Sequence, residues 1–150
     1  MPEIVIVDTS VLIALEKIEL LSVLCGIYKE IILPDGVIKE FGSVNIECYS
    51  AQKVESRLAD FLARDLNLGR GESEVIALSY ETKLKALIDD LKARKVAIDL
   101  GLTISGSIGI LLKAEKLGLI QSALKKVMEL KDKGFYVSDE LLAEISKLKT

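Results

Sequence analysis

Histidine is absent from this chain of 150 residues. Without an imidazole, neither Ser-His-Asp nor Cys-His catalysis can be assembled, and imidazole proton relays and His-ligated zinc sites are excluded as well. Chemistry at neutral pH must therefore use carboxylates, lysines, tyrosines, hydroxyls or a bound ion. The chain contains 23 Asp and Glu residues, so a hard cation held by oxygen ligands is the natural candidate.

Long apolar runs, a basic leader and paired cysteines are also missing. No run approaches the roughly 20 apolar residues that span a bilayer, and the first residues lack the pattern of a secretory signal. Cys25 and Cys48 stand alone, without a Cys-x-x-Cys pair, so we expect free, half-buried thiols in a reducing compartment. These absences predict a single cytoplasmic domain over residues 1–150 that does not associate with membranes.

Short β-branched runs alternate with segments of helical spacing along the rest of the chain. Strands are predicted at about 3–7, 31–33, 84–88 and 102–104. Helices are predicted at about 10–25 (with a possible break at 17–18), 34–41, 51–63, 72–82, 91–100, 107–118, 121–131 and 138–149, whereas 45–49 is ambiguous. The alternation is typical of an α/β fold, a three-layer α/β/α sandwich with a mostly parallel sheet.

Acidic residues stand where these strands end or where helices begin. Asp8 follows the first strand, Glu40 lies in the helix after the second, Glu72 opens a helix, and Asp89 and Asp90 follow the third strand. The exits of parallel strands share one edge of a sheet, so Asp8 and the later pair converge if their strands are neighbours. Clustered carboxylates cannot all ionise without a cation, which predicts a site for Mg²⁺ or Mn²⁺.

Each acid also has a purely structural interpretation. Asp8 and one residue of the pair at 89–90 could cap helices, and Glu40 could be a solvated helical residue. Glu72 and Glu74 could be first-turn acids favoured by the helix dipole. Because these two glutamates are two positions apart, they point to roughly opposite sides of a helix, and only one is expected to reach the site.

Positive charge is concentrated in one part of an otherwise acidic chain. Residues 83–128 contain nine lysines and arginines against four acids, while the whole chain has a net charge of −3. Lys92, Arg94 and Lys95 lie just after the acidic pair and are candidates for binding a polyanion. The alternative interpretation is that these charges only form a solvated helix surface. Ser107, beside a glycine at a helix start, could contact phosphate through backbone amides or act as a plain cap.

Four segments resemble, in order and in separation, the motifs of PIN-domain ribonucleases, and the tail at 103–120 looks like that of their VapC-like prokaryotic branch. The segments are Val7–Ile13, Val37–Phe41, Gly71–Leu78 and Leu87–Arg94. The resemblance implies a metal-dependent endoribonuclease acting on single-stranded RNA. Its Mg²⁺ or Mn²⁺ ligands would be Asp8, Glu40, Glu72 and Asp90, with Glu74 and Asp89 as alternates and Ser10 orienting a carboxylate or a water molecule.

The VapC-like likeness further implies a toxin that forms a homodimer and a small antitoxin protein that blocks the acidic groove. Many members of the family carry aspartate at the third acidic position, where this chain offers Glu72 or Glu74. Two other functions are also compatible with the sequence. The chain could be a degenerate PIN fold that binds RNA or a protein without cutting, or a metal-dependent phosphatase acting on small phosphoesters.

Overall fold

Five parallel strands form the centre of the computed structural model, which describes residues 3–147. They are β1 (Ile4–Val7), β2 (Glu30–Pro34), β3 (Tyr49–Gln52), β4 (Ala86–Leu87) and β5 (Ile104–Ser105), in the order β3-β2-β1-β4-β5. All four strand pairs are parallel. The register pairs Ile6 of β1 with Ala86 of β4, so the two strands whose exits carry acids are neighbours, as the convergence of those acids requires.

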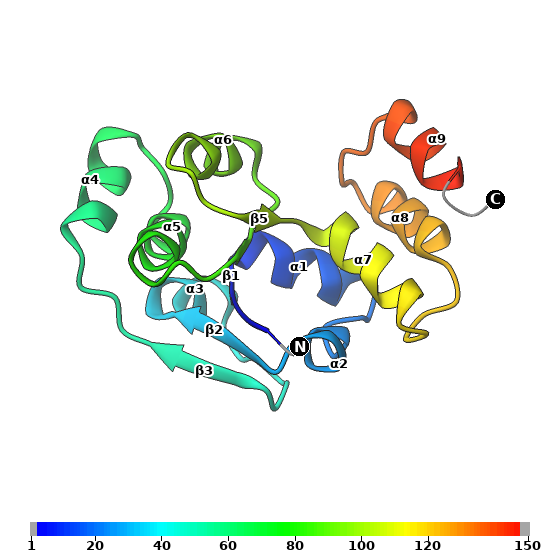
Figure 1. Ribbon diagram of the computed structural model, residues 1–150, viewed down its shortest axis with the longest axis horizontal. Coiled ribbons are helices and arrows are strands. Elements are labelled where there is room, and N and C mark those ends of the chain that lie inside the picture. Colours follow the sequence, from blue (N-terminus) through cyan, green and yellow to red (C-terminus); the bar gives the residue numbers. More distant parts are fainter. Residues whose placement is uncertain (1–2, 148–150) are drawn as a thin grey trace.

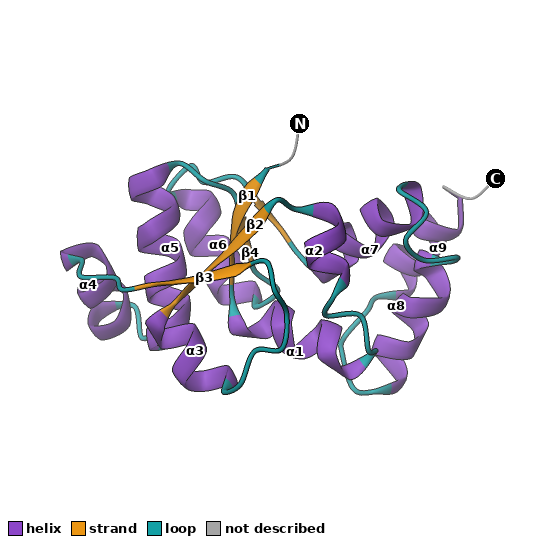
Figure 2. Cartoon of the chain, turned by 90° about the horizontal axis from the view of Figure 1, so that it is seen from below, coloured by secondary structure: helices purple, strands orange, loops and turns teal. Residues whose placement is uncertain are grey.

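Helices cover both faces of this sheet. They are α1 (Thr9–Lys17), α2 (Val23–Ile27), α3 (Asp35–Phe41), α4 (Arg57–Asp65), α5 (Arg70–Thr82), α6 (Leu91–Asp99), α7 (Ser107–Lys116), α8 (Ala123–Asp132) and α9 (Asp139–Lys147). The sheet lies between α5 and α6 on one side and α2 and α7 on the other (Figure 2). The predicted three-layer α/β/α fold is therefore confirmed, and α8 and α9 extend it beyond α7 (Figure 1).

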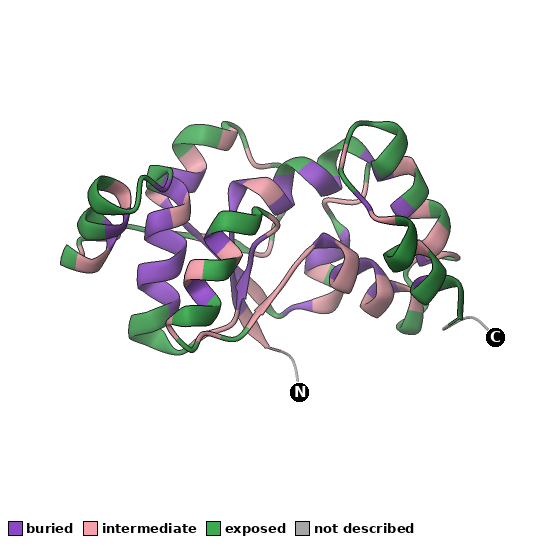
Figure 3. Cartoon of the chain, turned by 90° about the horizontal axis from the view of Figure 1, so that it is seen from above, coloured by how far each residue is buried: buried purple, intermediate pink, exposed green. Residues whose placement is uncertain are grey.

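The apolar runs of the sequence become strands that are buried on both faces. Val5, Ile6 and Val7 of β1 and Ile31 and Leu33 of β2 are fully buried, which is what a central parallel strand requires. Buried positions continue into the middle of α5 and into the helix faces that pack on the sheet (Figure 3). No helix among residues 3–147 is both long enough and apolar enough to cross a bilayer.

Besides shifts at the ends of strands, two segments differ from the elements that the sequence predicted. The helix expected at 10–25 is divided into α1 and α2, close to the possible break at 17–18, and Glu19 between them has a φ of 57°. The helix expected from residue 51 begins only at Arg57, where the hydroxyl of Ser56 accepts a hydrogen bond from the Ala59 amide. The preceding residues form β3, which pairs with β2. The predicted end of the last helix, beyond residue 147, lies outside the described residues.

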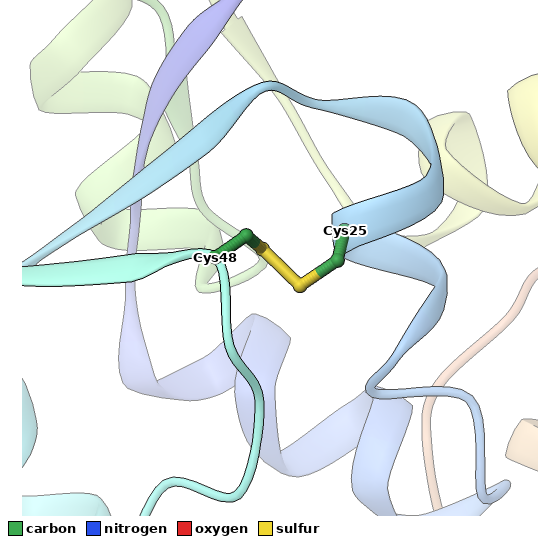
Figure 4. The surroundings of a disulfide bond; sticks show 2 residues. All are labelled: Cys25 and Cys48. Carbon is green, nitrogen blue, oxygen red and sulfur yellow. A yellow bond between two sulfur atoms is a disulfide. The ribbon is translucent and has the colours of Figure 1, made fainter.

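The prediction of free thiols was wrong, because Cys25 and Cys48 form a disulfide bond (Figure 4). Cys25 belongs to α2, and Cys48 immediately precedes β3, 23 residues later. The amide of Ile31 donates to the carbonyl of Cys48, so pairing of β3 with β2 places Cys48 near the helix that leads into β2. The bond is thus a consequence of tertiary pairing that the spacing of the two cysteines does not reveal.

Candidate functional site

Asp8 stands at the exit of β1, where its backbone amide continues the pairing with β4 by donating to Leu87. Its side chain is only 1% exposed, and it does not cap α1. Oδ2 accepts a hydrogen bond of 2.8 Å from the Ser10 hydroxyl, whereas Oδ1 is buried without a hydrogen-bond partner among the described residues. Burial raises the pKa of Asp8 to about 6, although Ser10 and nearby amides oppose this, and the charge of Glu40 adds to it.

Ser10 connects the ends of two neighbouring strands. Its hydroxyl donates to Asp8 and accepts a hydrogen bond of 3.1 Å from the backbone amide of Asp89, at the exit of β4. A hydroxyl that donates on one side and accepts on the other has a fixed orientation. Ser10 therefore holds one oxygen of Asp8 in place, and its role beside a metal ion stays a prediction.

Glu72 and Glu74, which the sequence could not separate, have different surroundings. Glu72 accepts a hydrogen bond of 3.0 Å from the Gly69 amide. Burial raises the pKa of Glu72 to about 7; the Gly69 amide lowers it, and the charges of Asp8 and Asp90, together with a hydrogen bond to Asp90, raise it further. This carboxyl therefore faces the other acids.

Glu74, in contrast, is held by donors at both oxygens. Its Oε1 accepts from the Gly36 amide and its Oε2 from Nε of Arg70, both at 2.8 Å. The side chain is buried, and its charge is compensated by the guanidinium. Arg70 was not singled out in the sequence, although its position four residues before Glu74 on one helix face is the spacing at which such pairs form.

Glu40 and Asp90 are exposed, and one carboxylate oxygen of each accepts a hydrogen bond from a backbone amide in the first turn of a helix. Glu40 accepts a hydrogen bond of 3.0 Å from the Gly71 amide at the start of α5. Asp90 is the N-cap of α6 and accepts a hydrogen bond of 2.9 Å from the Ala93 amide. These bonds fix the directions of the two side chains and place Glu40 within electrostatic reach of Asp8 and Asp90 within that of Glu72.

The donor set fits a hard divalent cation in its chemistry. Every candidate ligand is a carboxylate, the type of oxygen that Mg²⁺ and Mn²⁺ prefer, and the buried Oδ1 of Asp8 lacks a partner among the described residues. Within residues 3–147, no three acidic side chains lie close enough together to hold an ion as they stand. Convergence on an ion would therefore require side-chain movement, in which Glu40 and Glu72 would have to leave their hydrogen bonds to the Gly71 and Gly69 amides.

The basic residues expected to bind RNA differ in accessibility. Lys92 and Lys95 are exposed on α6, and Nζ of Lys92 lies 3.5 Å from the carbonyl oxygen of Asn67. Arg94 is half-buried and donates a hydrogen bond of 2.7 Å to the carbonyl of Ile88. Ser107 is buried at the start of α7. The structure therefore presents Lys92 and Lys95 to solvent and uses Arg94 within the fold.

Fold and site together define an α/β protein whose acidic side chains gather at the carboxyl edge of a parallel sheet, where such folds keep their active sites. A family model described as a PIN domain matches residues 4–150. The chain belongs to the PIN-domain family, and this confirms the resemblance seen in the motifs. Membership indicates a nuclease-type hydrolase from a family that typically uses divalent metals. No curated protein matches the chain, and the VapC-like branch stays a prediction.

Proposed function

We propose that this protein is a Mg²⁺- or Mn²⁺-dependent endoribonuclease that hydrolyses phosphodiester bonds of single-stranded RNA at the carboxyl edge of the sheet. The observation that carries the proposal is the buried carboxylate of Asp8, which has one oxygen without a partner among the described residues. Its charge acts on Glu72, and the charge of Glu40 acts on it. A carboxylate in this position is costly without a compensating cation.

Asp8, Glu40, Glu72 and Asp90 are the residues that would hold the ion. A divalent ion held there would lower the pKa of a coordinated water and offset negative charge on the reacting phosphate. Ser10 keeps Asp8 oriented through the hydrogen bond to Oδ2. The carboxyl of Glu72, whose pKa is raised to about 7, is only partly ionised near neutral pH, and a bound cation would displace the remaining proton.

The surface beside these acids suits the backbone of RNA better than its bases. Lys92 and Lys95 are exposed on the helix that Asp90 caps, and lysines attract phosphates without regard to sequence. Aromatic residues make up only 5% of the chain, so little is available for stacking on unpaired bases. This combination favours recognition of the phosphate backbone.

The partners and the cellular role are proposed from the VapC-like motifs. We propose a homodimer that acts as the toxin of a toxin–antitoxin pair, with a small antitoxin protein covering the acidic edge. The cytoplasmic location was supported by the expectation of reduced cysteines, and the bond between Cys25 and Cys48 removes that support. A cytoplasmic location stays a prediction.

The decisive experiment compares purified wild-type protein with Asp8→Asn on single-stranded RNA, with Mn²⁺ or Mg²⁺ and with a chelator. Asp99→Asn is the matched control, because Asp99 is an exposed acid at the far end of α6. We expect metal-dependent cleavage by the wild type and by the control, and a loss of at least about 100-fold in Asp8→Asn, as for removal of a principal electrostatic group.

Two results would contradict the metal mechanism: cleavage that survives the chelator, and equal cleavage by Asp8→Asn. Saturable RNA binding without cleavage would favour the alternative of a binding module. Metal-dependent hydrolysis of a small phosphoester such as p-nitrophenyl phosphate, with RNA left intact, would favour the phosphatase.

A further inference from the structure

Asp89 lies between two serines that come from different parts of the chain. Its Oδ1 accepts a hydrogen bond of 2.8 Å from the Ser107 amide, and its Oδ2 accepts the Ser107 hydroxyl. Its own amide donates to the hydroxyl of Ser10 at 3.1 Å. Ser10 belongs to α1 and Ser107 to α7, and these helices contact each other (Figure 1). Both carboxylate oxygens of Asp89 are therefore committed to the start of α7.

Backbone atoms and Arg94 crowd the space at Gly106, beside this carboxylate. A Cβ atom at Gly106 would lie 2.7 Å from Oδ1 of Asp89 and 2.8 Å from Nη1 of Arg94. It would also lie 3.3 Å from the carbonyl oxygen of Ile88, which accepts a hydrogen bond from the same Nη1. Glycine at 106 thus allows β4 and the start of α7 to approach closely around Asp89.

Asp90, the next residue, has the opposite environment. It is exposed, and its charge and a hydrogen bond raise the pKa of Glu72. Side chains of successive residues in an extended segment point in opposite directions, so one member of the pair faces the acids of the site while the other faces α7. The sequence predicted both as candidate ligands. The contacts distinguish them, because Asp90 acts on Glu72 and Asp89 binds Ser107.

We propose that Asp89 is a positioning residue rather than a metal ligand. Its carboxylate fixes the start of α7, and its backbone amide fixes the Ser10 hydroxyl, which in turn orients Asp8. A line of hydrogen bonds thus runs from Ser107 through Asp89 and Ser10 to Asp8. This inference deepens the proposed function and rests on it, because it assigns which acid of the pair acts on the cation.

Replacing Asp89 with asparagine distinguishes a positioning residue from a metal ligand. Its amide oxygen can accept from the Ser107 amide, and its NH₂ group can donate to the Ser107 hydroxyl. Both bonds to the start of α7 are therefore kept, while the negative charge is lost. Asp89→Ala removes both bonds. We expect Asp89→Ala to lower the melting temperature of the metal-free protein by about 3–6 °C and to weaken Mn²⁺ binding about tenfold. Asp89→Asn should keep most of the wild-type melting temperature and most of the wild-type affinity for Mn²⁺.

Asp90→Asn is the comparison variant for Mn²⁺ binding, measured by isothermal titration calorimetry. It should weaken Mn²⁺ binding at least about tenfold with little change in the melting temperature of the metal-free protein, because asparagine is also a good N-cap. If Asp89→Asn weakens Mn²⁺ binding as much as Asp90→Asn does, Asp89 is a ligand and the proposal fails. It also fails if Asp89→Ala matches the wild type in both measurements.

Ser107→Ala provides a milder version of the same test in case Asp89→Ala does not fold. It removes only the hydroxyl bond and should produce a smaller shift in the same two measurements; no shift in either would contradict the positioning role. The melting temperatures of the metal-free variants are independent of the nuclease assignment. If Asp8→Asn binds Mn²⁺ like the wild type, the proposed function fails while the capping role of Asp89 is still measured.

Discussion

Glu74 and Gly36 join α5 to α3, because the carboxylate of Glu74 accepts the backbone amide of Gly36 at 2.8 Å. The relationship is reciprocated: Glu40 of α3 accepts the amide of Gly71 at the start of α5 at 3.0 Å. Each helix thus caps the other. The two acids differ in what else they touch, since Glu74 is buried and also accepts from Arg70, whereas Glu40 is exposed.

Removal of the Glu74 carboxylate is expected to destabilise the fold. Among the described residues, Arg70 would keep its ion pair with Asp60, and the Gly36 amide would be buried without an acceptor. We expect Glu74→Ala to lower the free energy of unfolding in urea by about 2–3 kcal/mol and Glu74→Gln by less, because glutamine retains an acceptor. Glu81→Ala, at an exposed position of the same helix, is the control and should change it by less than about 0.5 kcal/mol.

Gly71 should matter to the site more than to the fold. A Cβ atom there would lie 2.5 Å from Oε1 of Glu40, which is the end of a flexible side chain. Gly71→Ala should therefore displace Glu40 and weaken Mn²⁺ binding about tenfold, with a loss of stability in urea no larger than that of a lost helix cap. Gly36→Ala is the contrast, because its Cβ would meet the Gly71 backbone at 3.1 Å and should destabilise the fold. Equal stability losses in both variants would contradict this division.

Asp8 was predictable from the sequence because a buried β-branched run ends in it and the strand rule fixes where that end lies. The choice between Glu72 and Glu74 was not predictable, since it depends on the Gly36 amide contributed by another helix. The strand β3 escaped detection because its positions are exposed or half-exposed and carry little apolar pattern. A local sequence pattern shows which residues of one segment are buried. Contacts between distant segments decide which of two neighbouring acids has its carboxylate oxygens taken up by hydrogen-bond donors.

The metal-free protein is expected to lose stability as the pH rises. The pKa of Asp8 is raised from 3.8 to about 6 and that of Glu72 from 4.5 to about 7. Between about pH 4 and 7 the folded state therefore binds more protons than the unfolded state, and the free energy of unfolding falls through this window. Thermal melts should show a smaller fall in Asp8→Asn than in the wild type, and added Mn²⁺ should stabilise the wild type more at pH 8 than at pH 5. Identical pH profiles of variant and wild type would refute this.

The disulfide between Cys25 and Cys48 should stabilise the segment that carries α3. It closes a loop across a sequence separation of 23 residues, which includes β2 and the helix bearing Glu40. Replacing both cysteines with serine should lower the free energy of unfolding by about 2–4 kcal/mol, measured in urea. A reducing agent should lower the stability of the wild type to that of the double variant and leave the variant unaffected. A wild type that is insensitive to the reductant would count against the bond.

Lys92 and Lys95 should contribute to RNA affinity through charge alone, unlike Arg94. Binding can be measured by fluorescence anisotropy in the Asp8→Asn background with a chelator, so that RNA is not cleaved. Each lysine-to-alanine change should reduce the slope of log affinity against log salt by about 0.7–1. Lys29→Ala, an exposed lysine before β2 at the opposite edge of the sheet, should leave the slope unchanged. Arg94→Ala should instead lower stability, because the hydrogen bond from its side chain to Ile88 is lost. An effect of Lys29→Ala as large as that of Lys92→Ala would place the RNA elsewhere on the surface.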